Sequence, residues 1–278
     1  MAHKYFDTVS HAAIYSKFRP KTPDALVQRI VAYVSEKIPG PLEVAVDVGC
    51  GSGQSTEALA PYFSKVLGVD ASETAINEAN KKVKISNVTY GTSAAEKLNF
   101  QDNSVTLVTA GQACHWFNLP AFYEEVKRIL IPGGTLALYG YQLPRPMYRG
   151  PTAKDLSPII DKFYGDTLGS YVQQGSRECY IGMYSNEKYQ IPLATRPLQR
   201  DDSVYLEQKG TLADLIGYVS SWSAFQYYLR ENGEEKAARI LKEFENELLA
   251  TTGSNKKPEE TDITVRFKYF LLLGRKAL

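Results

Sequence analysis

Three glycines within five positions follow an apolar run in the stretch VDVGCGSGQST, residues 46–56. Gly49, Gly51 and Gly53 form a GxGxG pattern, and the preceding segment LEVAVDVG has the composition of a buried strand. Glycine has no Cβ, so its backbone can turn sharply and a ligand can approach it closely. The stretch therefore predicts a strand, a tight turn and a helix that begins after Gly53, with a ligand at the turn.

The segments around this loop alternate between strand and helix patterns. A first helix is predicted with Thr22 as its N-cap and Pro23 at its first position, and a later one with Ser72 as its N-cap. Strands are predicted over 42–49, 65–70, 87–91, 104–111 and 135–142, and helices after Gly53 and over 72–83 and 119–130. Strands that alternate with helices form βαβ units, so we expect an α/β fold with a doubly wound, mostly parallel sheet.

The second half of the chain has a different character. Residues 143–200 are rich in proline and tyrosine, which predicts an insertion after the fifth strand. The stretch TLADLIGYVSSWSAFQYYLRE then predicts a helix capped by Thr211, and DITVRFKYFLLLGRK, residues 262–276, predicts a last strand.

Composition and charge narrow the class of protein. The 278 residues are 44% hydrophobic and carry a net charge of +1 with interspersed charges, so nothing favours nucleic acid or an anionic membrane. No apolar stretch reaches the roughly 18 residues that a bilayer span needs, and the amino terminus lacks the apolar core of a signal peptide. Three cysteines without CxxC spacing predict free thiols and no metal site. We expect a cytoplasmic monomer or homodimer that binds neither nucleic acid, nor membrane, nor metal.

The ligand at the glycine turn is predicted to be a nucleoside. Asp70 ends the second strand, 70 − 51 = 19 residues beyond Gly51, where a carboxylate can accept both hydroxyls of a ribose. A dinucleotide fingerprint needs a glycine at position 54, which is Gln54 here, and no Gly-Lys-Ser/Thr follows as in a phosphate-binding loop. The loop therefore suits a ligand that need not carry phosphate.

At this point the sequence resembles the class I S-adenosylmethionine-dependent methyltransferases. The stretches VDVGCGSGQST, LGVDAS, AAEKLNF, DNSVTLVTAGQACHWF and VKRILIPGGTLALYG match the successive motifs of that family over about residues 40 to 141. YSKFRP, QACHWF and VSSWSAFQYY are similar to the branch that contains trans-aconitate methyltransferases and related small-molecule enzymes. The resemblance implies a Rossmann-like, seven-stranded sheet with a reversed terminal hairpin, in which SVYLEQKG pairs with the last strand.

The resemblance also implies which residues hold S-adenosylmethionine. The glycine loop lines the methionyl part, Asp70 holds the ribose and Asp47 accepts from the methionyl ammonium, directly or through water. A lid over the cofactor carries Tyr15 and Arg19, with Arg19 a candidate partner for the methionyl carboxylate. Many relatives have an aspartate where this chain has Ala94, so adenine is expected to contact main-chain groups instead. The full set of cofactor-binding residues is Tyr15, Arg19, Asp47, Gly49, Gly51, Gly53, Asp70, Ala94, Ala95 and Gln112.

Methyl transfer is an in-line displacement, so the enzyme mainly has to align the acceptor with the methyl group and contributes little covalent chemistry. Gln112 and His115 follow the fourth strand and are the candidate catalytic residues. Two interpretations of His115 stay open: it deprotonates the acceptor or bonds an anionic one, or it only packs against the cofactor and bonds the backbone. Trp116 is expected to form an apolar wall.

The resemblance divides the chain into four parts. They are a lid and first helix over 1–40, a cofactor-binding core over 41–142, a substrate-covering helical insertion over 143–200, and the helices and last strands over 201–278. Arg145, Arg149, Arg177 and Arg196 are possible clamps for a substrate carboxylate. The candidate substrate-binding residues are Trp116, Tyr141, Arg145, Arg149 and Trp222.

The expected function is methyl transfer to a small-molecule acceptor, with a carboxylate oxygen as one candidate and a phenol or amine as alternatives. A nucleotide-dependent oxidoreductase is disfavoured by Gln54 in the fingerprint position. A catalytically silent scaffold is disfavoured by the intact loop with Asp70, and methylation of protein or nucleic acid by the absence of an NPPY-type motif and of a basic groove.

Overall fold

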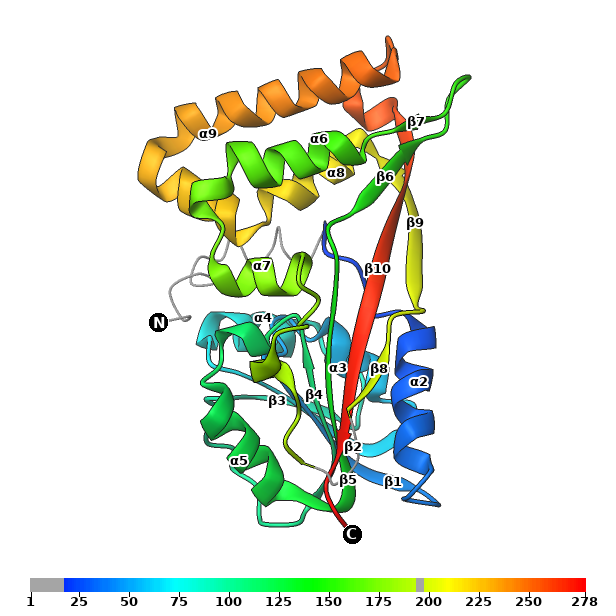
Figure 1. Ribbon diagram of the computed structural model, residues 1–278, viewed down its shortest axis with the longest axis vertical. Coiled ribbons are helices and arrows are strands. Elements are labelled where there is room, and N and C mark those ends of the chain that lie inside the picture. The colour runs from blue at the N-terminus through cyan, green and yellow to red at the C-terminus, as the bar shows by residue number, and fades with distance from the viewer. Residues whose placement is uncertain (1–17, 194–197) are drawn as a thin grey trace.

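The computed structural model describes residues 18–193 and 198–278. Its first half is a parallel sheet with helices on both faces (Figure 1). The five parallel strands are β1 (Leu42–Val48), β2 (Phe63–Asp70), β3 (Val88–Thr92), β4 (Val105–Gly111) and β5 (Leu130–Tyr141). The helices between them are α2 (Asp24–Ser35), α3 (Gln54–Leu59), α4 (Glu73–Lys82) and α5 (Leu119–Ile129). This confirms the predicted α/β fold.

The strand order is β3-β2-β1-β4-β5-β10, so the order reverses between β1 and β4. Neighbouring residues of β1 point into two different cores: Ala45 packs with α2, and Val46 packs with α5. A sheet that is buried on both faces needs near-continuous apolar strands, which is what the sequence provides. The reversal places a crevice at the carboxyl ends of β1 and β4, where such sheets bind their ligands.

The last strand organises the second half of the sheet. β10 (Asp262–Arg275) is antiparallel to β5 along one half of its length, and short strands pair with the opposite edge of that half and with the other half. These strands are β6 (Arg145–Tyr148), β7 (Lys154–Asp155), β8 (Gln199–Asp201) and β9 (Tyr205–Thr211), with β7 joined through β6. The pairing of β9 with β10 confirms the predicted partner SVYLEQKG. The expected number of seven strands was too low, because the long β10 recruits short strands from the insertion and the described sheet has ten.

A helical cap lies over the carboxyl ends of the parallel strands (Figure 1). Its helices are α6 (Ser157–Lys162), α7 (Gln174–Tyr180), α8 (Leu212–Ser220) and α9 (Ser223–Thr252). Helices from both sides of residue 200 pack together in it, since α6 and α8 each contact α9. None of the described helices is long and apolar enough to cross a bilayer.

Two helix boundaries differ from the sequence prediction. Pro23 has extended backbone dihedrals and serves as the N-cap of α2, so the helix begins at Asp24. The single helix predicted after Thr211 is two helices, because Ser221 ends α8 and Trp222 is extended before α9 begins.

Thr211 does form the predicted cap, in a capping box with Asp214. Ser72 also caps α4 as predicted, accepting a hydrogen bond from the backbone N–H of Ala75.

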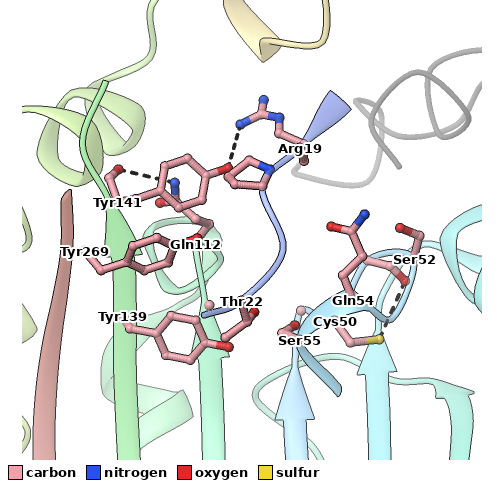
Figure 2. Close-up of a pocket in the computed structure, with 14 residues that line it drawn as sticks. Arg19, Thr22, Cys50, Ser52, Gln54, Ser55, Gln112, Tyr139, Tyr141 and Tyr269 are labelled. Carbon is pink, nitrogen blue, oxygen red and sulfur yellow. Dashed lines mark hydrogen bonds between the residues drawn. The ribbon is translucent and has the colours of Figure 1, made fainter. Parts of the chain in front are cut away.

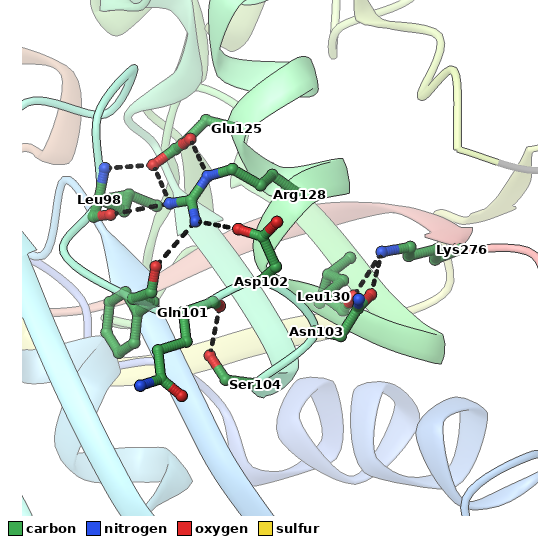
Figure 3. Close-up of polar contacts among 10 residues, drawn as sticks. Leu98, Gln101, Asp102, Asn103, Ser104, Glu125, Arg128, Leu130 and Lys276 are labelled. Atoms are coloured by element: carbon green, nitrogen blue, oxygen red, sulfur yellow. Dashed lines mark hydrogen bonds and ion pairs between the residues drawn. The ribbon is translucent and has the colours of Figure 1, made fainter.

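Arg128 on α5 fastens the loop that follows β3 (Figure 3). Its guanidinium donates to both carboxylate oxygens of Glu125 at 2.8 Å and to Asp102 at 2.7 Å. It also donates to the carbonyl oxygens of Phe100 and Leu98 at 2.8 and 3.1 Å. One side chain thus holds several points of the loop, together with backbone bonds from Asn103 and Ser104 to the end of α5.

We predict that Arg128→Met lowers the free energy of unfolding by about 1–2 kcal/mol, because several carbonyl and carboxylate groups lose a charged donor. Urea denaturation measures the change. Arg266→Met is the matched control: Arg266 pairs with the exposed Glu207 at 3.1 Å and lies over the ring of the exposed Tyr205, so the expected change is within about 0.5 kcal/mol. Equal losses in the two variants would contradict the anchoring role.

Candidate functional site

A pocket opens at the carboxyl ends of β1, β4 and β5 (Figure 2). Three tyrosines, Tyr139, Tyr141 and Tyr269, stand on one side of it. The glycine loop and the first residues of α3 stand on the other side, and Arg19, Thr22 and Gln112 complete the lining. The lining thus combines an aromatic wall, exposed main chain and neutral polar groups, with one cation.

The glycine loop is held to β2 by its backbone. The N–H groups of Gly49 and Cys50 both donate to the carbonyl oxygen of Val69, at 2.8 and 3.1 Å. All three glycines have positive φ angles, which L-residues with side chains rarely adopt. A Cβ at Gly49 would lie 2.5 Å from Ala113, and one at Gly53 2.2 Å from the Tyr90 hydroxyl. Packing therefore requires these two glycines.

Gly51 differs from the other two glycines of the loop. A Cβ placed on it would meet no heavy atom within 4 Å. Its φ of 54° demands a permissive residue, but the space beside it is open and belongs to the pocket. A ligand can therefore approach the main chain of the loop at this residue.

Asp70 lies at the end of β2 with both carboxylate oxygens oriented by main-chain donors. Its Oδ2 accepts from the backbone N–H of Gly51 at 2.9 Å, and its Oδ1 accepts from that of Ser72 at 2.8 Å. The two main-chain donors thus fix the orientation of the carboxylate at the end of the strand. The side chain is only partly buried and contacts the main chain of Gly51, which lines the pocket, but Asp70 itself is not one of the lining residues. This geometry fits a ligand with two adjacent hydroxyls.

Asp47 lies beneath the loop rather than in the pocket wall. It is fully buried on β1 and accepts hydrogen bonds from Ser55 at 2.6 Å, Thr56 at 2.8 Å and Thr109 at 2.7 Å. Burial raises the pKa of Asp47, and the three hydroxyl donors act in the opposite direction. The structure therefore does not bring Asp47 to the position expected for a direct contact with a methionyl ammonium, because its carboxylate is enclosed by α3 and β4.

Arg19 lines the pocket but points its guanidinium into the cap. It donates to the hydroxyls of Tyr180 and Tyr141, at 2.7 and 3.2 Å, and to the side chain and carbonyl of Ser221, at 3.0 and 3.1 Å. Its side chain thereby joins the segment before α2 to β5, α7 and the junction of α8 with α9. Tyr15, its expected companion in the lid, lies outside the described residues.

The expected adenine wall lies beyond the pocket residues. Ala94 is exposed and Ala95 is buried in the core with α5, and neither lines the pocket. The backbone N–H of Ser93 donates to the carbonyl oxygen of Asp70 at 2.9 Å, which places this loop next to the end of β2. Adjacency to Asp70 is the geometry that a nucleoside base would require.

His115 is packed under the cap, outside the pocket lining. Its Nδ1 lies 2.6 Å from the Tyr184 hydroxyl and its ring centroid 4.8 Å from that of Trp116. Gly175 of α7 covers it, since a Cβ there would lie 2.9 Å from the His115 carbonyl. Desolvation lowers the pKa of His115 to about 3, so the imidazole is neutral at physiological pH.

Gln112 does line the pocket, in a left-handed backbone conformation with φ of 54°. Its backbone N–H donates to the carbonyl of Tyr139 at 2.9 Å, and its side-chain oxygen accepts a hydrogen bond from the Cys179 thiol of α7. Its amide nitrogen donates to the carbonyl of Tyr141 at 3.4 Å. These contacts fix the side chain between β5 and the cap.

Most of the arginines expected as substrate clamps lie away from the pocket. Arg145 is exposed and pairs with Asp161 at 2.7 Å, and Arg149 is exposed as well. Arg177 donates to the carbonyl of Gly169 at 2.6 Å. Arg196 lies outside the described residues. The expectation that Arg145 and Arg149 bind substrate is not supported, because the insertion places both on the surface.

Tyr141 lines the pocket as expected, whereas Trp222 is buried in the cap and Trp116 stacks beside His115. Sequence reasoning missed Tyr139 and Tyr269, which also line the pocket. Tyr139 and Tyr141 are two residues apart on β5 and share a face, a period-2 signal that the sequence contains. Tyr269 stands opposite Tyr141 in the β5–β10 register, and no local pattern reveals that pairing.

Known proteins match this arrangement. A family model described as a methyltransferase domain matches residues 46–138. A Dictyostelium discoideum protein described as a methyltransferase is 33% identical over 262 residues, covering 94% of this chain and 92% of that protein. The S-adenosylmethionine-dependent methyltransferase CRG1 of Saccharomyces cerevisiae is 26% identical over 256 residues, covering 82% of this chain and 84% of that protein.

A solved structure of a type II methyltransferase from Anaeromyxobacter dehalogenans superposes with a TM-score of 0.72 at 28% identity, covering 94% of this chain and all of that one. The similarity to this structure and to the Dictyostelium protein extends over both the sheet and the cap. The chain belongs to the class I S-adenosylmethionine-dependent methyltransferases.

Proposed function

We propose that this methyltransferase acts on a small-molecule acceptor and that the acceptor atom is a carboxylate oxygen. The observation that carries the cofactor assignment is the Asp70 carboxylate, which two backbone N–H groups orient beside the open main chain of Gly51. An adenosine ribose offers the two adjacent hydroxyls that this carboxylate can accept. The similarity of YSKFRP, QACHWF and VSSWSAFQYY to the trans-aconitate branch supports a carboxylate acceptor.

The pocket suits the methionyl part of the cofactor. An amino-acid tail needs acceptors for its ammonium and donors for its carboxylate, and the lining supplies Thr22, Ser52, Ser55 and Gln112 beside bare main chain. When bound, S-adenosylmethionine supplies a sulfonium methyl group: the C–S bond breaks, its electron pair stays on sulfur, and the acceptor oxygen forms the new C–O bond. In this assignment Tyr139 and Tyr141 shield that region from water.

A carboxylate acceptor agrees with the residues around the pocket. It is already an anion at neutral pH, so no proton has to be removed. No aspartate, glutamate or histidine is among the described residues that line the pocket. His115 lies outside the lining with a pKa of about 3, far below that of an efficient base at neutral pH.

Location and assembly are further parts of the proposal. Cys50, Cys114 and Cys179 are buried free thiols, which fits a reducing compartment such as the cytoplasm. We propose a cytoplasmic monomer or homodimer.

Asp70→Ala is predicted to weaken S-adenosylmethionine binding by at least about tenfold, because two charge-assisted hydrogen bonds to ribose are lost. Asp70→Asn should be milder, since its amide carbonyl still accepts one bond. Calorimetric titration measures the affinities, with circular dichroism as the folding check. Asp161→Ala, which removes an exposed carboxylate on α6 outside the pocket lining, is the control and should bind as the wild type does. Unchanged affinity in a folded Asp70→Ala protein would remove the ribose assignment.

His115→Asn is predicted to retain substantial turnover and an unchanged pH–rate profile near neutrality. In the wild type His115 is neutral above a pKa of about 3, so it does not titrate in that range. The unfolded chain binds a proton near its ordinary value of 6.5, so the wild type should lose stability as pH falls from there toward 3. The variant should lose less. A large fall in turnover together with loss of a limb near pH 6–7 would instead make His115 the base.

A further inference from the structure

Three buried polar groups of the cap make no hydrogen bond of ordinary length to a described residue: the hydroxyls of Tyr164 and Tyr218 and the indole N–H of Trp222. The Tyr218 hydroxyl and the Trp222 indole lie close enough for only a weak interaction with each other. The three side chains are 4%, 3% and 2% exposed. Leaving a polar group buried and unsatisfied costs about 1–3 kcal/mol, so native structures contain few such groups. Three of them in contact with one another require an explanation.

The three side chains form one cluster. The Trp222 ring lies edge-on to Tyr164 and to Tyr218, with ring centroids 5.4 and 5.8 Å apart. Tyr164 in turn packs edge-on against Tyr180 at 6.0 Å, and the Arg19 guanidinium sits 5.1 Å over the ring of Tyr218. We call these five residues, Arg19, Tyr164, Tyr180, Tyr218 and Trp222, the cap cluster.

The cap cluster adjoins the cofactor pocket. Arg19 belongs to both, and Tyr141, which lines the pocket, packs against Tyr180 at 6.1 Å and accepts a hydrogen bond from Arg19 at 3.2 Å. A molecule bound against the cap cluster would therefore be next to the pocket assigned to the methionyl part. This is where a methyl acceptor has to be.

The chemistry of the cap cluster selects an oxyanion. An indole N–H and a guanidinium donate hydrogen bonds and accept none, and burial raises the pKa of the Tyr164 and Tyr218 phenols, which keeps both protonated as donors. Aromatic rings can also surround an organic cation, but here a guanidinium already covers the ring of Tyr218. A second cation at that ring would be repelled by Arg19.

We propose that the cap cluster is the acceptor-binding site and that Tyr164, Tyr218 and Trp222 donate hydrogen bonds to a carboxylate of the acceptor, with Arg19 supplying the positive charge. The inference rests on the proposed function and deepens it by naming the residues that select the acceptor. The vacant donors are then partners of the substrate rather than defects of the fold.

The variants Tyr164→Phe, Tyr218→Phe and Trp222→Phe test the proposal, because each removes the vacant donor and keeps an aromatic ring. Without ligand, Tyr164→Phe and Tyr218→Phe should leave the thermal midpoint unchanged or raise it, since no hydrogen bond of ordinary length is lost. Trp222→Phe should lower the midpoint, because the smaller ring leaves a cavity at a buried position. Tyr123→Phe is the matched control: its hydroxyl on α5 donates to the carbonyl of Lys188 at 3.2 Å, so this change should lower the midpoint.

Binding is then measured by calorimetry with the protein saturated by S-adenosylhomocysteine. The probes are the sodium salts of succinate, citrate and benzoate, with ethanolamine and choline as cationic comparisons. We expect at least one carboxylate to bind the wild type and the Tyr123→Phe control equally. Each cap-cluster variant should bind it about tenfold or more weakly, as expected for a lost hydrogen bond to a charged group.

The proposal is overturned if no carboxylate binds, if the variants bind carboxylates as tightly as the wild type, or if the amines bind instead. It is also overturned if Tyr164→Phe and Tyr218→Phe are destabilised as Tyr123→Phe is, because that would mean buried water satisfies these two hydroxyls. Failure of S-adenosylhomocysteine itself to bind the wild type is a separate result, which would contradict the proposed function.

Discussion

The buried carboxylate of Asp47 is the contact on which the cofactor-binding half depends. It lies on β1 and accepts hydrogen bonds from Ser55 and Thr56 of α3 and from Thr109 of β4, so one side chain joins three elements. Burying a carboxylate is costly unless its lone pairs are satisfied, and three hydroxyls meet that requirement here. These hydrogen bonds fix the start of α3 relative to the sheet. Because the glycine loop connects β1 to α3, they also fix the two ends of the loop.

A second set of contacts connects this core to the cap. Arg19 comes from the segment before α2, yet its hydrogen bonds go to residues of β5, α7 and the α8–α9 junction. The same side chain lines the pocket, so cofactor and cap meet at a single guanidinium. The expected pairing of Arg19 with a methionyl carboxylate would have to share its donors with these cap residues. In our proposal, the positive charge of Arg19 acts mainly on the carboxylate of the acceptor.

Sequence patterns predicted the structural features that depend on residues close together in the chain. The five parallel strands, the caps at Ser72 and Thr211 and the glycine turn all follow from local periodicity and local turn chemistry. The break at Trp222 did not follow, since Trp222 is buried among aromatic rings of α8 and of the segment between α6 and α7, which are distant in sequence or not visible in a local pattern. The ten-stranded sheet was also missed, because strand pairing with β10 joins segments far apart in sequence.

For the candidate site, too, the sequence predicted contacts that are local in the chain and missed those between distant segments. The loop glycines and Asp70 lie within one βαβ unit, and the structure brings them together. Arg19 and Ser221 are 202 positions apart, and no pattern in the sequence indicates that they meet. Arg145 and Arg149 were expected to bind substrate from their charge and location in the insertion, but their exposure depends on how that insertion packs. Charge alone does not reveal which arginine is buried.

A crystal structure of the protein with S-adenosylhomocysteine tests the central claim most directly. The account predicts that both ribose hydroxyls bond the Asp70 carboxylate, while the homocysteine part lies along Gly49 and Gly51 and faces Tyr139 and Tyr141. The cap cluster should then adjoin the sulfur end of the ligand. A ligand whose ribose is remote from Asp70, or whose sulfur points away from Tyr141 and Arg19, would contradict the account.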